Sequence, residues 1–297
     1  MTTSTRYRRP YRTGIRPLLV VVAATATVFA AGTEIPAAPP GEEPLLEMLF
    51  FGDIMIGRRI ETIAVEHGVE HFFGDVRRLP DGRGLDRFDV VSANLEGPVT
   101  TGGAHAPPVY PYDFAFSPER VDILRKMGIS FLTIANNHLY DQGTAGVEST
   151  RRYLTDLGIE HSGDLDHVIS SHSVTYIRRN GVRIAMIGLS EVYDVLDRDA
   201  VRELIREAAA VSDLQIVNIH WGVEYETRAR RGQRDMATIL VRAGADLVVG
   251  HHPHVVQGME IVSGVPVFYS LGNFIFDQAF SEEVRRGYAV YIAFHGI

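Results

Sequence analysis

The sequence lacks cysteine, internal repeats and low-complexity segments. The absence of cysteine excludes disulfide bonds, thiolate metal ligands and a cysteine nucleophile together. The absence of repeats argues against a solenoid or a fibrous fold. The sequence also lacks a Gly-x-Ser-x-Gly motif, so we do not expect the nucleophile elbow of a serine hydrolase. With 297 residues, 45% of them hydrophobic, the chain is long enough to bury a full core in one large or two small domains.

The N-terminal segment is basic and then apolar. Five arginines without an acidic residue lie between Arg6 and Arg16, and the run from Leu18 to Ala31 is mostly apolar. This order is typical of an export signal. The run is shorter than the about 20 apolar residues of a stable transmembrane helix, which favours a cleaved signal peptide over an uncleaved signal anchor. We therefore expect residues 1–31 to be one of these two, and the protein to be exported: extracytoplasmic, secreted or tethered to the membrane.

The segment after this leader contains four prolines between Ile35 and Pro44. Such a composition is typical of a stiff, extended spacer, so we expect a linker over residues 32–44 and a folded domain over residues 45–297. The whole chain has 29 basic and 37 acidic side chains. Without the five leader arginines, its net charge falls to about −13. Nucleic acid is therefore not an expected partner, and an anionic substrate would need a local positive charge such as a bound metal.

Short apolar runs alternate with amphipathic segments along the folded part, which predicts an α/β fold. The runs with the length of buried strands are Leu45–Phe51, Asp89–Ala93, Ile129–Ala135, Leu214–His220 and Asp246–Gly250. The segments expected to form helices are Ser117–Gly128, Gly146–Leu157, Asp199–Ala210 and Gly232–Ala243. Asn180 and Gly181 separate two further apolar runs, which is a strong signal for a β-hairpin. The sheets are therefore expected to be mixed and not purely parallel.

Polar side chains follow the end of each expected strand. The clusters are Gly52–Met55, Asn94–Glu96, Asn136–His138, His220–Gly222 and Gly250–His254. In open α/β folds, ligands bind outside the carboxyl ends of the strands, so these clusters are expected to meet. Oxygen and nitrogen donors without thiolates suit divalent Zn, Mn, Fe or Mg, and the imidazoles argue against Mg or Ca alone.

Each cluster also has a purely structural interpretation. Asp53 and Glu96 could serve turns, and Asn136–Asn137 could bond local backbone groups. His220, taken alone, would more often be a satisfied core histidine. The three imidazoles between His251 and His254 have little structural use after an apolar strand. Five such clusters at successive strand ends together favour a metal site over the structural interpretation.

Six motifs occur in order along nearly the whole chain after the leader. They are Gly52-Asp53-Ile54-Met55, Asn94-Leu95-Glu96, Ala135-Asn136-Asn137-His138 with Asp141 and Gly143, His220-Trp221-Gly222-Val223-Glu224-Tyr225, Gly250-His251-His252-Pro253-His254-Val255-Val256-Gln257 and Tyr269-Ser270-Leu271-Gly272-Asn273-Phe274. This set resembles the CapA family, which is associated with poly-γ-glutamate capsule synthesis. CapA proteins resemble calcineurin-like metallophosphoesterases. The resemblance implies a sandwich of two mixed β-sheets flanked by helices, with a centre of one or two divalent metal ions.

The resemblance also implies a set of metal ligands, for which Mn, Zn or Fe are the expected ions. The implied ligands are Asp53, Glu96, Asn137, His220, His252 and His254. His251 is close enough to the closing His-x-His pair to compete with it.

Two positions depart from the usual phosphoesterase pattern. Where that family has histidine two residues after its first aspartate, this chain has Met55, whose thioether is a poor ligand for hard divalent metals. One metal position is therefore expected to be weak or missing. The second motif usually offers a bridging aspartate, and here the candidates are Asn94 and Glu96. Only Glu96 carries charge, so we predict Glu96 as the ligand.

The implied chemistry is metal-assisted hydrolysis, in which the metal polarises the scissile group and lowers the pKa of water. His138, outside the ligand set, would protonate the leaving group or stabilise the transition state, supported by Asp141 as the second catalytic residue. The expected substrate-binding residues are Asn94, Glu224, Tyr225 and Asn273.

Two aromatic segments near the motifs have alternative interpretations. The segment Thr100–Ser117 follows Glu96 directly and is either a binding lip over the metal site or a hydrophobic plug under a long loop. Around Tyr269–Asp277, Ser270, Gly272 and Asn273 would shape the floor of the pocket, whereas Phe268, Phe274 and Phe276 are expected in the core.

Three function classes follow from these features. In the first, the domain is a hydrolase for a phosphoester or a cell-envelope polymer linkage, including a γ-glutamyl amide. In the second, it is a non-catalytic accessory protein that binds poly-γ-glutamate during export or assembly, with a membrane-bound polymer synthase complex as the partner. In the third, the polar clusters only stabilise a scaffold. Metal analysis with a phosphodiester assay separates the first two classes.

Overall fold

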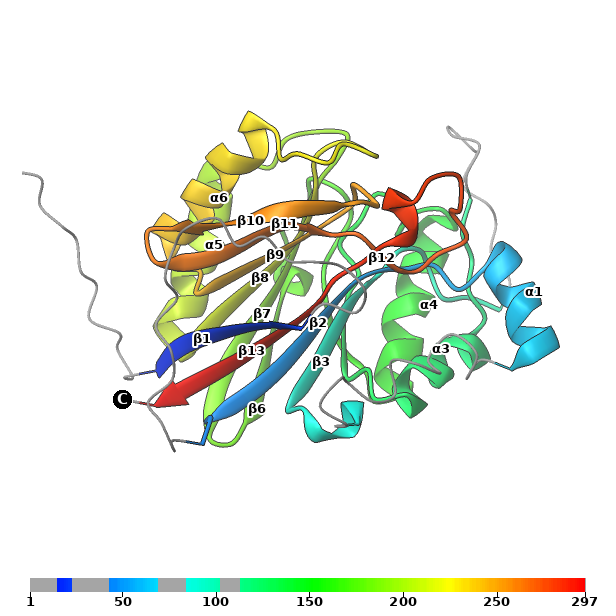
Figure 1. Ribbon diagram of the computed structural model, residues 1–297, viewed down its shortest axis with the longest axis horizontal. Coiled ribbons are helices and arrows are strands. Elements are labelled where there is room, and N and C mark those ends of the chain that lie inside the picture. Colours follow the sequence, from blue (N-terminus) through cyan, green and yellow to red (C-terminus); the bar gives the residue numbers. More distant parts are fainter. Residues whose placement is uncertain (1–14, 23–42, 69–83, 102–112, 297) are drawn as a thin grey trace, which may run out of the picture.

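The structure is a computed structural model, and it describes residues 15–22, 43–68, 84–101 and 113–296. Within these ranges the chain forms two β-sheets that pack face to face, with helices on the outer side of each sheet (Figure 1). The expected α/β fold with two mixed sheets flanked by helices is confirmed. In the part of the chain that the structure describes, no helix is long and apolar enough to cross a membrane.

The first sheet has the strand order β1-β13-β2-β3-β4-β5, and β12 pairs with β2 outside this path. Its strands are β1 (Ile15–Val22), β2 (Leu46–Ile54), β3 (Val90–Leu95), β4 (Phe131–Thr133), β5 (Glu160–Ser162), β12 (Asn273–Ile275) and β13 (Ala289–Gly296). The strands from β2 to β5 are parallel, whereas β13 is antiparallel to both β1 and β2. The carboxyl ends of β2 and β3 therefore lie at one edge, where the first two polar clusters begin.

The second sheet has the strand order β10-β11-β9-β8-β7-β6. Its strands are β6 (Val174–Arg179), β7 (Val182–Glu191), β8 (Leu214–Trp221), β9 (Leu247–His251), β10 (Val256–Val262) and β11 (Val265–Leu271). The expected hairpin at Asn180–Gly181 joins β6 to β7. Its two turn residues have φ angles of 48° and 83°, as the tight turn of a two-residue hairpin requires.

The four expected helices form close to their predicted positions, and within the described residues the structure adds a helix over residues 58–67 and three short 3-10 helices that were not predicted. The helices are α1 (Arg58–His67), α3 (Pro118–Lys126), α4 (Gly143–Asp156), α5 (Arg198–Val211) and α6 (Arg231–Ala243), with the short 3-10 helices η1 (Leu85–Arg87), η2 (Ser171–Ser173) and η3 (Glu283–Arg285). Proline at the first position of α3 presets the helical φ angle. Gly128, with φ of 105°, follows the end of α3, where other residues would be strained.

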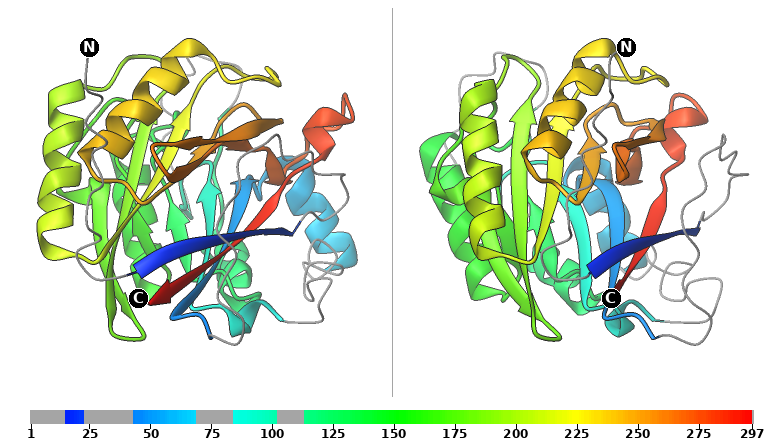
Figure 2. Two further views of the ribbon diagram at one scale, coloured as in Figure 1. Left: turned by 60° about the vertical axis from the view of Figure 1, so that its left-hand side comes forward. Right: turned by 90° about the vertical axis from the view of Figure 1, so that its left-hand side faces the viewer.

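Three apolar clusters fill the spaces between the layers. Alternate side chains of β2 belong to two different clusters. Leu46, Met48 and Phe50 point between the two sheets, whereas Leu49 and Phe51 point toward the helices on the first sheet. A third cluster lies between the second sheet and α5 and α6. Each fully buried side chain of this size contributes about 1.5–3 kcal/mol. The turned views of Figure 2 show α5 and α6 along the outer face of the second sheet.

The expected leader and linker lie mostly outside the described residues, which leave out 1–14 and 23–42. The described part of the leader is β1, which pairs with β13 along its whole length. Cleavage of the leader stays a prediction.

Candidate metal centre

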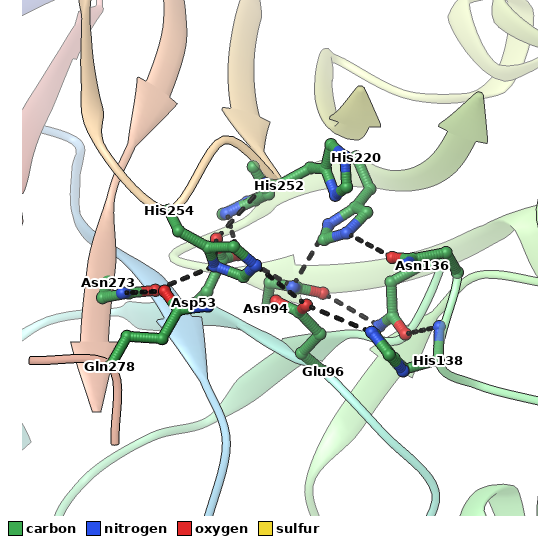
Figure 3. Close-up of polar contacts among 12 residues, drawn as sticks. Asp53, Asn94, Glu96, Asn136, His138, His220, His252, His254, Asn273 and Gln278 are labelled. Carbon is green, nitrogen blue, oxygen red and sulfur yellow. Dashed lines mark hydrogen bonds and ion pairs between the residues drawn. The ribbon is translucent and has the colours of Figure 1, made fainter. Parts of the chain in front are cut away.

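The polar clusters at the strand ends meet at one place because the strand register aligns them. Asp53 on β2 lies opposite Asn94 on β3 and opposite Asn273 on β12. In the second sheet, His220 at the end of β8 lies opposite His251 at the end of β9. Figure 3 shows side chains from both sheets pointing toward one another across this edge.

Asp53 is fully buried at the centre of the group. Its Oδ1 accepts a hydrogen bond from Asn94 Nδ2 at 2.8 Å, and its Oδ2 accepts one from the backbone N–H of His252 at 3.2 Å. Burial opposes ionisation of Asp53, but the adjacent His251 imidazole, helped by His254 and by the hydrogen bond from Asn94, lowers its pKa. The side chain is therefore a carboxylate at neutral pH, in the form that binds a cation.

Glu96 is buried, and among the described residues neither of its carboxylate oxygens has a hydrogen-bond partner. The nearest basic atoms are His254 Nε2 at 3.5 Å and His138 Nε2 at 4.0 Å from Oε1. Burial, followed by the negative charges of Asp53, Glu224 and Asp141, raises the pKa of Glu96 well above its usual value. A buried carboxylate without partners is costly, and a cation at this position would remove that cost.

The imidazoles of His220, His252 and His254 are buried and held in the neutral form. Burial and the neighbouring histidines lower the pKa of His220 well below its usual value. Burial, with the charge of His254, lowers the pKa of His252 to about 3. The pKa of His254 is lowered mainly by burial. A neutral imidazole has the lone pair that a metal ligand requires.

Several imidazole nitrogens also lack hydrogen-bond partners. They are both ring nitrogens of His251 and Nδ1 of His252. His251 Nδ1 lies 3.4 Å from Asp53 Oδ1, so His251 is part of the group that the structure assembles. It remains beside the predicted His252 and His254 as a candidate ligand.

Amide side chains connect the carboxylates to the imidazoles. Asn94 Nδ2 lies 3.3 Å from His220 Nδ1 in addition to its bond to Asp53. Asn94 Oδ1 accepts from Asn136 Nδ2 at 3.1 Å. Asn137 Oδ1 lies 2.9 Å from His220 Nε2. Asn94 was expected among the substrate-binding residues, and its place is in the buried interior of the site, between Asp53 and His220.

Asn136 is a site residue that sequence reasoning left out of the candidate set. Its Nδ2 donates to Asn94 Oδ1 and to the backbone oxygen of Leu95, and its Oδ1 accepts from the backbone N–H of His138. Asn136 therefore ties the ends of β3 and β4 together. Its signals in the sequence are its place in the polar cluster after the expected strand and in the family motif beside Asn137.

His138 and Asp141, the predicted catalytic pair, are in contact. His138 Nδ1 lies 2.8 Å from Asp141 Oδ2, which also accepts the backbone N–H of Phe114 at 2.8 Å. The ring of Phe114 lies 4.3 Å from the ring of His138, centroid to centroid. Since Asp141 holds Nδ1, Nε2 is the nitrogen directed toward Glu96 and available for proton transfer.

The other predicted substrate-binding residues lie around this centre. Asn273 Oδ1 lies 3.0 Å from His254 Nδ1, and Asn273 is itself buried. The ring of Tyr225 is 6.1 Å from that of His254, and Tyr225 is 42% exposed. Glu224 beside it is exposed. The roles of these residues stay predictions.

Met55 is not directed at the polar group. It is fully buried in the cluster between the first sheet and its helices, and its sulfur accepts the backbone N–H of Gly57 at 3.3 Å. Of the segment Thr100–Ser117, expected to be either a binding lip or a hydrophobic plug, residues 102–112 lie outside the described residues, and Phe114 and Phe116 are buried in the same cluster. Phe268 is in the core between the sheets, as expected.

Two glycines allow the backbones at the site to approach closely. A Cβ on Gly52 would lie 1.8 Å from the backbone oxygen of Gly272, where the chain passes from β11 to β12. A Cβ on Gly250 would lie 2.2 Å from the backbone oxygen of Tyr269 and 2.5 Å from Trp221 Nε1. Trp221 is fully buried directly after His220 and donates to the Tyr269 oxygen at 2.8 Å. The precise placement of the strand ends therefore depends on glycine.

The assembled residues fit a divalent cation. Asp53, Glu96 and His220 each offer a ligand atom, and these atoms all lie within 4.8 Å of one another. The unpartnered ring nitrogens of His251 and His252 supply further donors. This mixture of oxygen and nitrogen donors suits Zn, Mn or Fe.

Comparison with known proteins gives matches over most of the chain. The family model described as bacterial capsule synthesis protein PGA_cap matches residues 47–278. The PGA biosynthesis protein CapA of Bacillus subtilis (strain 168) is 32% identical over 283 residues, which cover 89% of this chain and 72% of that protein. The capsule biosynthesis protein CapA of Bacillus anthracis is 29% identical and covers 90% of this chain and 68% of that protein.

More distant matches include a probable polyglutamine synthesis accessory protein of Mycobacterium tuberculosis, 25% identical, with 84% of this chain and 80% of that protein covered. Among solved structures, a hypothetical protein from Thermus thermophilus aligns with a TM-score of 0.47, 18% identity and 76% of each chain covered. A novel phosphatase from Mycoplasma pneumoniae aligns with a TM-score of 0.46, 16% identity, and 78% of this chain and 73% of that chain covered.

Proposed function

The chain belongs to the PGA_cap family of bacterial capsule synthesis proteins, and from that premise we propose that it is an extracytoplasmic, metal-dependent hydrolase with a phosphoesterase-type site. Its task would be a step in the synthesis of a poly-γ-glutamate capsule or another cell-envelope polymer. The observation that carries the proposal is Glu96, a buried carboxylate without a hydrogen bond, surrounded by the Asp53 carboxylate and neutral imidazoles. A bound cation would offset the cost of burying this carboxylate.

The residues that would hold one or two such ions come from both sheets. They are Asp53, Glu96, Asn137, His220, His252 and His254, with His251 as a further candidate. When bound, a divalent ion supplies Lewis acidity and makes water a better nucleophile near neutral pH. Met55 offers no donor here, because its sulfur is engaged with Gly57 in the apolar cluster.

The protein residues would position the substrate and move the proton. His138, whose Nδ1 is held by Asp141, would donate the proton on Nε2 to the leaving group. Asp141 would stabilise the imidazolium and fix the ring orientation. Tyr225, half exposed beside His254, and Glu224 would contact the substrate at the mouth of the site. The expected substrate is a phosphoester or an anionic polymer linkage such as a γ-glutamyl amide.

The test combines elemental analysis with assays on the purified protein. We expect Mn, Zn or Fe to co-purify, and turnover of a model phosphodiester or a γ-glutamyl polymer that chelators abolish. Glu96→Gln should lose the metal and the turnover. In chelator near neutral pH, however, Glu96→Gln should raise the free energy of unfolding by about 1–3 kcal/mol, because the raised pKa of Glu96 costs the folded state stability that a neutral amide does not cost.

The matched control is Glu47→Gln at the opposite end of β2, where Glu47 pairs with the hydroxyl of Tyr291 far from the site. It should keep both metal and turnover. A wild-type protein that binds no divalent metal in any of these assays would contradict the proposal.

A second candidate function is a non-catalytic accessory protein that binds poly-γ-glutamate during export or assembly, together with a membrane-bound synthase complex. The placement of Met55 in the core favours it, since one donor of the usual two-metal pattern is then absent. Metal or polymer binding without any turnover would support this function over hydrolysis.

A further inference from the structure

A buried carboxylate outside the metal centre organises the loop that follows β7. Asp166 lies in the connection between β5 and β6 and is 9% exposed. Its Oδ1 accepts from the hydroxyl of Ser190 and from the backbone N–H of Val192 at 2.8 Å. Its Oδ2 accepts from the backbone N–H of Tyr193 at 2.9 Å and of Asp194 at 3.4 Å. Four donors from one stretch of chain therefore converge on one side chain, which fixes the loop's path.

The loop that Asp166 fixes reaches the metal centre through Tyr193. The Tyr193 hydroxyl accepts a hydrogen bond from Asn137 Nδ2 at 3.2 Å. The other end of the same amide, Asn137 Oδ1, lies 2.9 Å from His220 Nε2. An amide can turn its oxygen or its nitrogen toward the centre, and only the oxygen binds a cation. The contact with Tyr193 sets the orientation in which Oδ1 faces inward.

We propose that Asp166 and Tyr193 are positioning residues for the metal centre, acting through Asn137. This inference rests on the proposed function, because it takes Asn137 as a ligand. Tyr193 follows a strand of the second sheet and Asn137 follows a strand of the first, so the contact links loops of the two sheets. Partners of this kind that orient a ligand typically change metal affinity or activity by about 10–100-fold.

The test is the Mn²⁺ affinity of the full chain, measured by calorimetric titration of Tyr193→Phe, Asn137→Ala and the double variant. Tyr193→Phe removes only the hydroxyl, and we expect about tenfold weaker Mn²⁺ binding with an unchanged melting temperature. In the Asn137→Ala background, the same change should have no further effect. Substituted Co²⁺ should show an altered visible spectrum in Tyr193→Phe, because the ligand geometry changes.

Two control variants separate positioning from general loss of structure. Tyr176→Phe removes a hydroxyl from a partly exposed tyrosine on β6, which packs on Arg183, and should leave Mn²⁺ affinity unchanged. Asp164→Asn, two residues before Asp166, removes a carboxylate that accepts hydrogen bonds from Ser170 and the Leu165 backbone. Among the residues that the structure describes, this carboxylate does not bond to the loop of residues 192–194. Asp164→Asn should also keep the affinity, whereas Asp166→Asn should weaken it.

The inference is overturned if Tyr193→Phe binds Mn²⁺ within twofold of the wild type, or if its effect persists without the Asn137 amide. Either result leaves the proposed function intact, provided that Glu96→Gln still loses the metal. A wild type that binds no Mn²⁺, Zn²⁺ or Fe²⁺ would instead overturn the proposed function, and this inference with it.

Discussion

The two sheets contribute opposite chemistry to the site. Among the proposed metal ligands, those that lie at or after strand ends of the first sheet are carboxylates and an amide, whereas those at or after strand ends of the second sheet are imidazoles. On the first side, Glu96 is a buried acid whose pKa is raised, and on the second side His220 is a buried base whose pKa is lowered. Burial therefore pushes both sides toward neutrality. A cation between them would restore the charge on the first side and use the neutral nitrogens of the second.

The difference also explains why neither sheet could form the site alone. A cluster of acids alone would repel itself, and a cluster of neutral imidazoles alone would lack charge to hold a hard cation. The chain brings the halves together where β11 of the second sheet leads into β12, which pairs with β2 of the first. The packing of the two sheets therefore places the two halves of the site against each other.

The largest expected effect comes from removing one ligand on each side. Asp53→Ala and His220→Ala should each lose the bound metal and all measurable turnover, although they belong to different sheets. Both should keep the fold, which circular dichroism would verify, with Asp122→Ala on α3 as a control outside the site. If either variant retains stoichiometric metal and full activity, the claim that both sheets are needed to bind the metal is wrong.

The next effect should separate proton transfer from metal binding. His138→Gln removes the proposed proton donor but no proposed ligand, so turnover should fall by about 10²–10⁴-fold while the metal content stays at the wild-type level. A pH–rate profile should lose its alkaline limb, because that limb reports the deprotonation of the general acid. Retention of the limb in His138→Gln would assign the donor to another group.

The smallest expected effect concerns Asp164, whose two carboxylate oxygens both accept hydrogen bonds, in contrast to those of Glu96. Burial opposes ionisation of Asp164, but hydrogen bonds from Ser170 and the Leu165 backbone and the charge of Arg151 lower its pKa below the usual 3.8. A lowered folded-state pKa stabilises the protein above the unfolded-state pKa, and this stabilisation is lost as pH falls through the folded-state value. Asp164→Asn should therefore melt at a lower temperature than the wild type near neutral pH, and the two melting temperatures should converge as the pH falls through the lowered folded-state pKa of Asp164. A constant difference at all pH values would contradict this account.

Much of this arrangement could be predicted from local sequence. Strand ends such as Ile54 and His251 were within a few residues of the expected positions, because apolar runs that end in polar clusters are a local signal. The hairpin at Asn180–Gly181 was confirmed, because its turn chemistry is contained in two residues. The family motif pointed to Asp53, Glu96 and the imidazoles, which the structure brings together.

The remainder depends on contacts between residues far apart in the chain. That Asn94 lies between Asp53 and His220 follows from strand register in one sheet and packing against another, which no local pattern contains. The interactions of Asp166 with the loop around Tyr193 join two connections that have no motif of their own. The pairing of β1 with β13 likewise joins opposite ends of the chain.

The chain has a single tryptophan, and Trp221 lies directly beside His220 with its indole against Tyr269. Its fluorescence is therefore an intrinsic optical reporter of this one position. Quenching or a spectral shift on loading with a paramagnetic ion would follow occupancy in real time, without a label and without any engineered residue.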